Sequence, residues 1–183
     1  DYNDFTDRTP DWAMKGNARD AKGRHSSDPN YDPTTLYVPP EELKKCTPTM
    51  KQYWQIKSQN YDKILLFKLG KFYELFYEDA LICHRELDFK WMGTKMHVGF
   101  PEGALDRFAP ELVNRGYKVC IVEHTETVKQ MEERLKKSSK EEKTIKRAMV
   151  QAMSKGTYVD PIDTNYEARI LLSLRNSKPL ISV

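Results

Sequence analysis

The sequence predicts an α/β (α+β) domain in which helices flank a mixed β-sheet, preceded by an extended N-terminal arm. Two observations predict this class. A strand, a kink, a short strand and a helix follow one another over residues 63–81, and a helix at 102–115 leads directly into a strand at 117–122. Such a succession favours a sheet faced by helices. With 183 residues, of which 39% are apolar and 31% charged, the chain has room for one domain and flanking segments.

The first forty residues are polar and rich in turn signals. Asp28-Pro29, Asp32-Pro33 and Pro39-Pro40 interrupt any helical or strand period. We expect an extended arm over 1–40, either one that docks on the domain or a disordered leader. Composition favours the leader.

The first helix is predicted to begin at Thr47-Pro48, an N-cap residue followed by proline, and to run to about residue 59. Its apolar face is expected to pack on a strand at 63–69. Gly70-Lys71 interrupts that strand, residues 72–75 resume it, and acidic residues open a helix at 78–81.

A loop is expected from Gly93 to Pro101, followed by the amphipathic helix at 102–115, which Gly116 ends in a left-handed conformation. Residues 125–147 have lysines and glutamates at the spacing of an exposed helix, a pattern that is most often a solvated face.

Segment 148–153 is ambiguous, because its Ala, Met and Gln favour a helix whereas its length fits a strand. A short helix is predicted over 166–174, and a strand is expected to open at 181–183.

Composition argues against several classes of protein. The net charge of +3 comes from 30 basic and 27 acidic residues, so charge alone does not identify a nucleic-acid partner. The three cysteines form no C-x-x-C pair, which disfavours a disulfide framework or structural zinc and favours a reducing compartment, the cytosol or nucleus. No apolar run is long enough to span a bilayer, so no membrane association is expected. Because the chain starts at Asp1 without a leader, we expect an excised fragment.

Catalytic signals are sparse. No G-x-x-x-x-G-K-[S/T] loop occurs, so we expect no ATP hydrolysis, catalytic residue or cofactor in this segment. No two of the four histidines lie four residues apart, which argues against a histidine pair on one helix face as a metal site. A metal-dependent nuclease is a weaker alternative, because its acids stand where strand ends and first helical turns ordinarily place them. Its candidate residues are Asp62, Glu74, Glu78 and Lys71.

The sharpest candidate site is the pair Phe72 and Glu74. On a strand the two side chains project from the same face, because side chains alternate with period two. A face that buried Phe72 in a core would also bury the Glu74 carboxylate without an evident cation, which is costly. On an exposed face, an aromatic ring and an acid would stand side by side next to Gly70 and Lys71. The motif alone leaves both readings open and favours a core Phe72 with Glu74 at a strand end.

Longer motifs give the pair a context. The chain resembles the Phe-x-Glu signature of the MutS mismatch-repair family in Gly70-Lys71-Phe72-Tyr73-Glu74-Leu75-Phe76, followed by Glu78-Asp79-Ala80. Further family motifs follow in order as His97-Val98-Gly99-Phe100-Pro101, Gly116-Tyr117-Lys118-Val119, Val122-Glu123 and Lys155-Gly156-Thr157. The resemblance covers roughly residues 34–174. Segments 32–39, 46–48 and 53–57 also resemble the eukaryotic subfamily that contacts the mispair, the sixth homologue of the series, in the MutS-alpha heterodimer.

The resemblance implies a fold like MutS domain I, with a strand at 148–153. It divides the chain into a polar N-terminal arm at 1–40, a mismatch-binding domain at 41–157, and a linker helix opening a connector domain at 158–183. It implies binding of double-stranded DNA with mismatches or small insertion/deletion loops, in the nucleus, with a partner MutS homologue subunit. ATP and Mg²⁺ would belong to the ATPase of the full-length family.

Residue roles follow from the same resemblance. Phe72 would stack on a mispaired base from the minor groove. Glu74, with its pKa raised beside DNA, would hydrogen-bond a nitrogen of that base. Phosphate contacts are expected from Lys71, Lys68 and Lys95, and apolar groove contacts from Leu69 and Met96. The alternative is a protein-interaction domain in which Phe72 is structural and the Lys-rich segment at 129–147 docks on an acidic partner.

Overall fold

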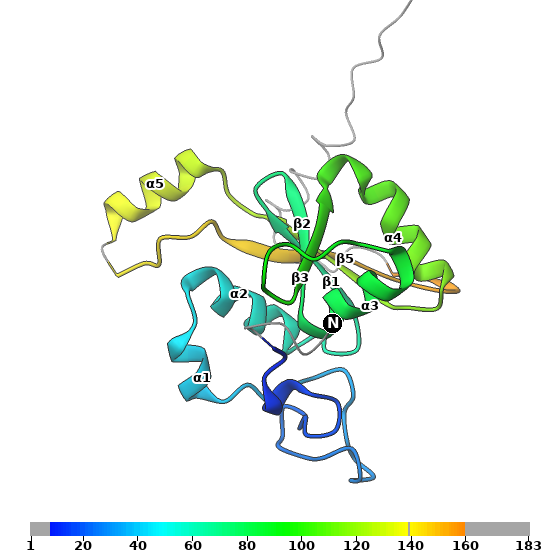
Figure 1. Ribbon diagram of the computed structural model, residues 1–183. Helices are drawn as coiled ribbons and strands as arrows, with labels where there is room; N and C mark the ends of the chain where they lie inside the picture. Colours follow the sequence, from blue (N-terminus) through cyan, green and yellow to red (C-terminus); the bar gives the residue numbers. More distant parts are fainter. Residues whose placement is uncertain (1–7, 139, 160–183) are drawn as a thin grey trace, which may run out of the picture.

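A six-stranded mixed sheet forms the centre of the computed structural model, which describes residues 8–138 and 140–159 (Figure 1). The strand order is β3-β2-β1-β4-β5-β6. The strands are β1 (Ile64–Leu69), β2 (Phe72–Phe76), β3 (His97–Pro101), β4 (Val119–His124), β5 (Arg147–Ser154) and β6 (Thr157–Val159). Strands β1 and β4 are parallel and every other neighbouring pair is antiparallel, which confirms the predicted mixed sheet.

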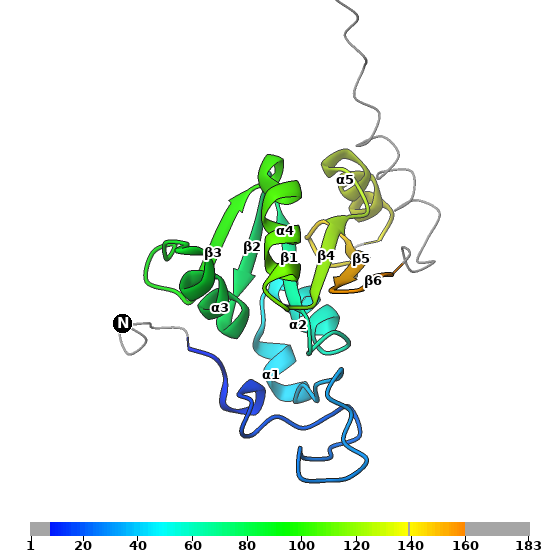
Figure 2. The same cartoon turned by 90° about the vertical axis from the view of Figure 1, so that its right-hand side faces the viewer.

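Helices cover both faces of the sheet (Figures 1 and 2). The helices of the described residues are η2 (Asp11–Ala13), α1 (Pro40–Lys45), α2 (Pro48–Lys57), α3 (Tyr77–Leu87), η3 (Glu102–Ala104), α4 (Leu105–Asn114) and α5 (Val128–Lys137), of which α5 projects from the sheet. Side chains alternate between the two faces along β1, so the protein has one hydrophobic core on each face of the sheet. Leu66 packs with α3 and α4 on one face, whereas Leu65 and Phe67 pack with α2 and the arm on the other. No helix among the described residues combines the length and the apolar character needed to cross a bilayer.

Local signals placed most of the helix ends correctly. The Thr47 side chain accepts a hydrogen bond from the Met50 amide at 3.4 Å and caps α2, as predicted. Gly116 follows α4 with a φ of +94°, the left-handed conformation expected of a helix terminator. A capping box between Thr127 and Gln130 starts α5, which has no buried residue, so an exposed helix is confirmed over Val128–Lys137. The predicted span of 125–147 is too long, because residues 140–146 are not helical.

The predicted loop from Gly93 to Pro101 is wrong in its second half. Residues 97–101 form β3, which pairs antiparallel with β2 along its full length and sets Gly99 opposite Glu74. Glycine and proline weaken the strand signal in the sequence, but pairing with a neighbouring strand overrides that local preference. The strand expected at 117–122 lies two residues later, at 119–124.

The ambiguous segment 148–153 lies within β5, as the family resemblance implies. Its pairing with β4 shifts register between Ile121 and Val122. The helix predicted at 166–174 and the strand at 181–183 lie outside the described residues.

A disordered leader is the wrong interpretation for residues 8–39, which dock on the α2 side of the sheet. Leu36 is buried, and the Trp12 and Trp54 rings meet edge to face with centroids 4.7 Å apart. Asp20 closes the arm by accepting hydrogen bonds from the amides of Lys22, Arg24 and Asp32. Burial raises the pKa of Asp20, but these hydrogen bonds outweigh it and lower the pKa to about 2. A few buried apolar side chains, together with the hydrogen bonds to Asp20, therefore hold the polar arm on the domain.

Candidate nucleic-acid interface

A tight turn between β1 and β2 presents Phe72. Gly70 adopts a φ of +58°, which glycine tolerates at low steric cost, and the turn sets Phe72 opposite Leu69. Phe72 is 42% exposed, whereas Tyr73 and Leu75 on the other face of β2 are fully buried. The interpretation of Phe72 as a core residue is therefore wrong, and its face is open at this point.

The sheet face is open because α2 covers only part of it. The Tyr53 ring packs on Phe67 and Phe76 with centroid distances of 5.6 and 5.1 Å. Both rings lie on the same face as Phe72 but farther from the turn, since Phe67 pairs with Glu74 and Phe76 ends β2. The end with Phe72 extends beyond the Tyr53 contacts, so a ligand can approach the ring.

Glu74 lies beside Phe72 on this face and is half-buried. It stands opposite Phe67 on β1 and Gly99 on β3. A Cβ on Gly99 would lie 3.3 Å from the Glu74 Cγ and 3.0 Å from the Tyr73 carbonyl oxygen, so the glycine leaves the room that the glutamate stem occupies. Burial raises the pKa of the Glu74 carboxyl. Burial thus makes this carboxyl, which lies next to an exposed ring, easier to protonate than a free glutamate.

The two lysines beside the turn have different environments. Lys71 is exposed at the tip, and its carbonyl oxygen accepts a hydrogen bond from the Glu102 amide at 2.8 Å. Lys68 projects from the opposite face, where it is 5% exposed, forms an ion pair with Glu102 and lies 4.7 Å from the Tyr73 ring centroid. The expectation that Lys68 contacts phosphate needs correction, because strand alternation points it into the fold.

Met96 needs the same correction. Its side chain is 2% exposed, and its sulfur lies 4.0 Å from the Thr9 hydroxyl, so it is not available for a groove contact. Leu69 is partly exposed on the Phe72 face and Lys95 is exposed. Both stay candidates for DNA contact.

Two further residues, which sequence reasoning did not single out, support this end of the sheet. The Arg147 guanidinium lies 5.0 Å from the Phe67 ring centroid and donates to the Lys68 carbonyl oxygen at 2.6 Å. Burial lowers the pKa of Arg147 to about 10. Its pairing partner His124 has a buried Nε2 atom without a hydrogen-bond partner, and burial, followed by the charge of Arg147, lowers the pKa of His124 to about 4. No local pattern marks either residue, because both depend on the pairing of β4 with β5.

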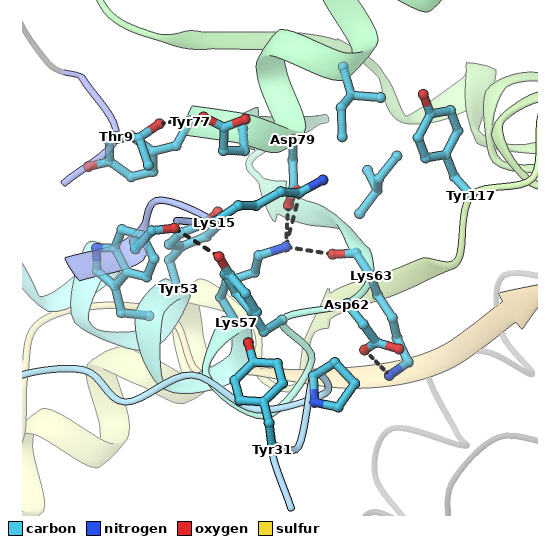
Figure 3. Close-up of a pocket in the computed structure, with 17 residues that line it drawn as sticks. Thr9, Lys15, Tyr31, Tyr53, Lys57, Asp62, Lys63, Tyr77, Asp79 and Tyr117 are labelled. Atoms are coloured by element: carbon cyan, nitrogen blue, oxygen red, sulfur yellow. Dashed lines mark hydrogen bonds and ion pairs between the residues drawn. The ribbon is translucent and has the colours of Figure 1, made fainter. Parts of the chain in front are cut away.

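A cavity of about 300 Å³ lies elsewhere, between the arm, α2 and α3 (Figure 3). At its wall the Lys57 ammonium contacts both carboxylate oxygens of Asp79, at 3.0 and 2.9 Å, and donates to the Lys63 carbonyl oxygen at 2.6 Å. The Lys57 ammonium and the Asp79 carboxylate neutralise each other, and their contact joins α2 to α3. Within the described residues, no group of three or more His, Cys, Asp or Glu side chains is placed to hold a metal ion.

Comparison with known proteins gives this geometry a family. Residues 47–161 match the model of MutS domain I. The DNA mismatch repair protein Msh6 of Gallus gallus is 45% identical over 151 residues, covering 80% of this chain and 11% of that protein. The protein of the same name from Homo sapiens is 42% identical over 180 residues, covering 93% of this chain and 13% of that protein.

A third relative, the DNA mismatch repair protein MSH6 of Saccharomyces cerevisiae, is 38% identical over 146 residues, covering 78% of this chain and 11% of that protein. The chain thus spans about an eighth of the length of these curated relatives. Because the family model matches more than half of the sequence and the relatives cover most of it, the chain belongs to the MutS domain I family.

Proposed function

We propose that this chain binds DNA as the mismatch-sensing domain of a mismatch repair protein, with Phe72 and Glu74 reading the mispaired base. Membership of the MutS domain I family and relatives named as DNA mismatch repair proteins support the general role. One observation carries the specific role, namely an exposed aromatic ring beside a half-buried carboxyl at the open end of a sheet face.

Phe72 acts as a wedge. Insertion of a ring at a base step from the minor groove costs a few kcal/mol of unstacking, and the cost is lower where pairing is already defective. Stacking of the ring on one base returns about 1–3 kcal/mol. Since a matched step resists the kink more strongly, the wedge reads the deformability of the duplex rather than its sequence.

Glu74 acts beside the ring as a hydrogen-bond donor. Burial already raises the pKa of its carboxyl, and the phosphates of a bound duplex raise the pKa further. A protonated Glu74 donates to a ring nitrogen of the base on which Phe72 stacks. This supplies a polar contact without placing a bare negative charge beside DNA.

The surrounding residues position the duplex. Lys71 at the turn contacts a phosphate, and Leu69 offers an apolar surface in the groove.

The whole protein works in the nucleus with a partner MutS homologue subunit, and ATP with Mg²⁺ serves the part of the family protein beyond this chain. The alternative interaction domain loses one of its two premises, because Phe72 is exposed.

The test is a titration of the whole protein with three duplexes, one matched, one with a G·T mispair and one with a single-base loop. Phe72→Ala should weaken mismatch binding roughly five- to 150-fold, which is the loss of about 1–3 kcal/mol of stacking. Binding to the matched duplex should change little. Tyr37→Ala is the control, because Tyr37 is similarly exposed at 44% but lies in the arm. A Phe72→Ala protein that still prefers the mismatch would refute the wedge.

A further inference from the structure

A projecting segment, the α5 excursion (residues 125–146), leaves the sheet at the same edge as the Phe72 turn. Because β4 runs parallel to β1, its last residue, His124, ends level with the β1 terminus at Leu69. The chain re-enters the sheet at Arg147, which pairs with His124. Strand β4 lies two strands from β2, so the root of the excursion is about 10 Å from the strand that holds Phe72.

The excursion also lies on the same side of the sheet as Phe72. Figure 1 shows α5 on the side of α2, away from α3 and α4. Its returning segment is tied to α2 by the hydroxyls of Thr49 and Thr144, which lie 3.0 Å apart, and by the Gln52 amide, which donates to the Ile145 carbonyl oxygen at 3.0 Å. Since α2 packs on the Phe72 face, these contacts fix the excursion beside that face.

Basic side chains neutralise several acids of the excursion. Arg134 is only 15% exposed and binds Glu126 and Glu141 at 2.6 Å each. The side-chain hydrogen bond from Arg134 lowers the pKa of both carboxyls. Lys51 of α2 neutralises Glu142 at 2.7 Å. Three of the acids are therefore occupied by contacts that hold the excursion together.

The lysines at the far end are exposed instead. They are Lys136, Lys137, Lys140 and Lys143. Glu132 and Glu133 of α5 and the later Glu141 and Glu142 are exposed acids, but the exposed lysines of the excursion, with Lys129 and Lys146 included, outnumber them. A ten-residue helix is about 15 Å long, which carries the last of its lysines well beyond the sheet edge.

We propose that the α5 excursion is a second DNA-binding element, which contacts backbone phosphates of the same duplex that Phe72 enters. The proposal rests on the proposed function for the identity of the partner. A duplex on the open face has phosphates on both sides of its minor groove, and the fixed lysine-rich tip stands beside that face. These contacts add affinity without sequence information, because phosphates are the same at every base pair. An acidic protein partner would not require the lysines to stand beside the face that holds Phe72, whereas a shared duplex does.

The experiment compares two fourfold variants of the whole protein that lose equal charge. The first changes Lys136, Lys137, Lys140 and Lys143 to Gln. The control changes Lys15, Lys22, Lys44 and Lys45 to Gln, which are exposed lysines of the arm and α1. The affinity for matched and G·T duplexes is measured over a series of salt concentrations, with Phe72→Ala in parallel.

The tip variant should lower the salt slope by about 0.9 for each phosphate that the lysines no longer neutralise, and by roughly two or more in total. Both duplexes should weaken by the same factor, so the mismatch preference survives, and the control should keep the native slope. An unchanged slope in the tip variant, or an equal loss in both variants, overturns the proposal. If Phe72→Ala keeps its mismatch preference while the tip variant loses slope, the wedge fails and the role of α5 in phosphate binding stands.

Discussion

Replacement of Phe72 by alanine tests the position of the ring through stability alone, without DNA. The ring is 42% exposed and faces Leu69 across the β1–β2 pair. A cross-strand pair of this kind contributes about 0.2–1 kcal/mol relative to alanine. Since the ring fills no core space, its removal leaves no cavity. We therefore expect Phe72→Ala to lower the free energy of unfolding by about 1 kcal/mol or less.

Phe67 on the neighbouring strand is the matched control. It is fully buried on the same face and packs edge to face with Tyr53 and Phe76, at centroid distances of 5.6 and 6.3 Å. Its truncation removes a large buried group and leaves a cavity, so Phe67→Ala should cost about 3–5 kcal/mol. The same Phe-to-Ala change should therefore cost much less stability at Phe72 than at Phe67, although the two residues stand on adjacent strands.

Urea unfolding of the 183-residue chain, followed by circular dichroism, measures both changes from the shift in midpoint at constant slope. The reasoning is refuted if Phe72→Ala costs as much as Phe67→Ala. That result would place the Phe72 ring in the core and remove the physical basis for a wedge. An increased stability of Phe72→Ala would agree with an exposed functional residue.

Three further variants test the neighbours of Phe72. Because burial raises the pKa of Glu74 from 4.5, its carboxyl stabilises the fold most below that pH, and this contribution is lost as pH rises through the folded-state pKa. Glu74→Gln should therefore gain stability relative to the native chain between about pH 4 and about pH 7 in urea titrations, and a difference that is constant with pH would contradict this. Lys71→Ala should weaken matched and mismatched duplexes equally and lower the salt slope by about one, so a selective loss of mismatch binding would show a different role. Gly99→Ala places a Cβ 3.0 Å from the Tyr73 carbonyl oxygen and should cost about 1–3 kcal/mol in thermal unfolding. The added methyl group also crowds the Glu74 side chain and should reduce mismatch preference. An unaltered melting temperature would contradict the expected clash, because it would show that β2 and β3 move apart at little cost.

The sequence by itself determined those features that depend on neighbours along the chain. Three local features depend only on one or two hydrogen bonds or one backbone angle, so the residue type alone predicts them. They are the N-cap at Thr47, the kink at Gly70 and the helix terminator at Gly116. Alternation along a strand likewise places Phe72 and Glu74 on one face without knowledge of any partner. The ordered motifs of the family supplied the strand at 148–153, where local propensity gave no decision.

Only the tertiary structure decided which of these side chains a ligand can reach. Exposure of Phe72 depends on how far α2 covers the sheet, and the burial of Lys68 away from any ligand depends on Glu102, which is distant in sequence. The strand at 97–101 and the folding of the arm also depend on partners far along the chain. The same holds for the α5 excursion, whose composition is typical of a solvated helix and does not show that Arg134 binds both Glu126 and Glu141. Burial and charge pairing are properties of the assembled surface, because each requires two segments to meet, and no local pattern records that meeting.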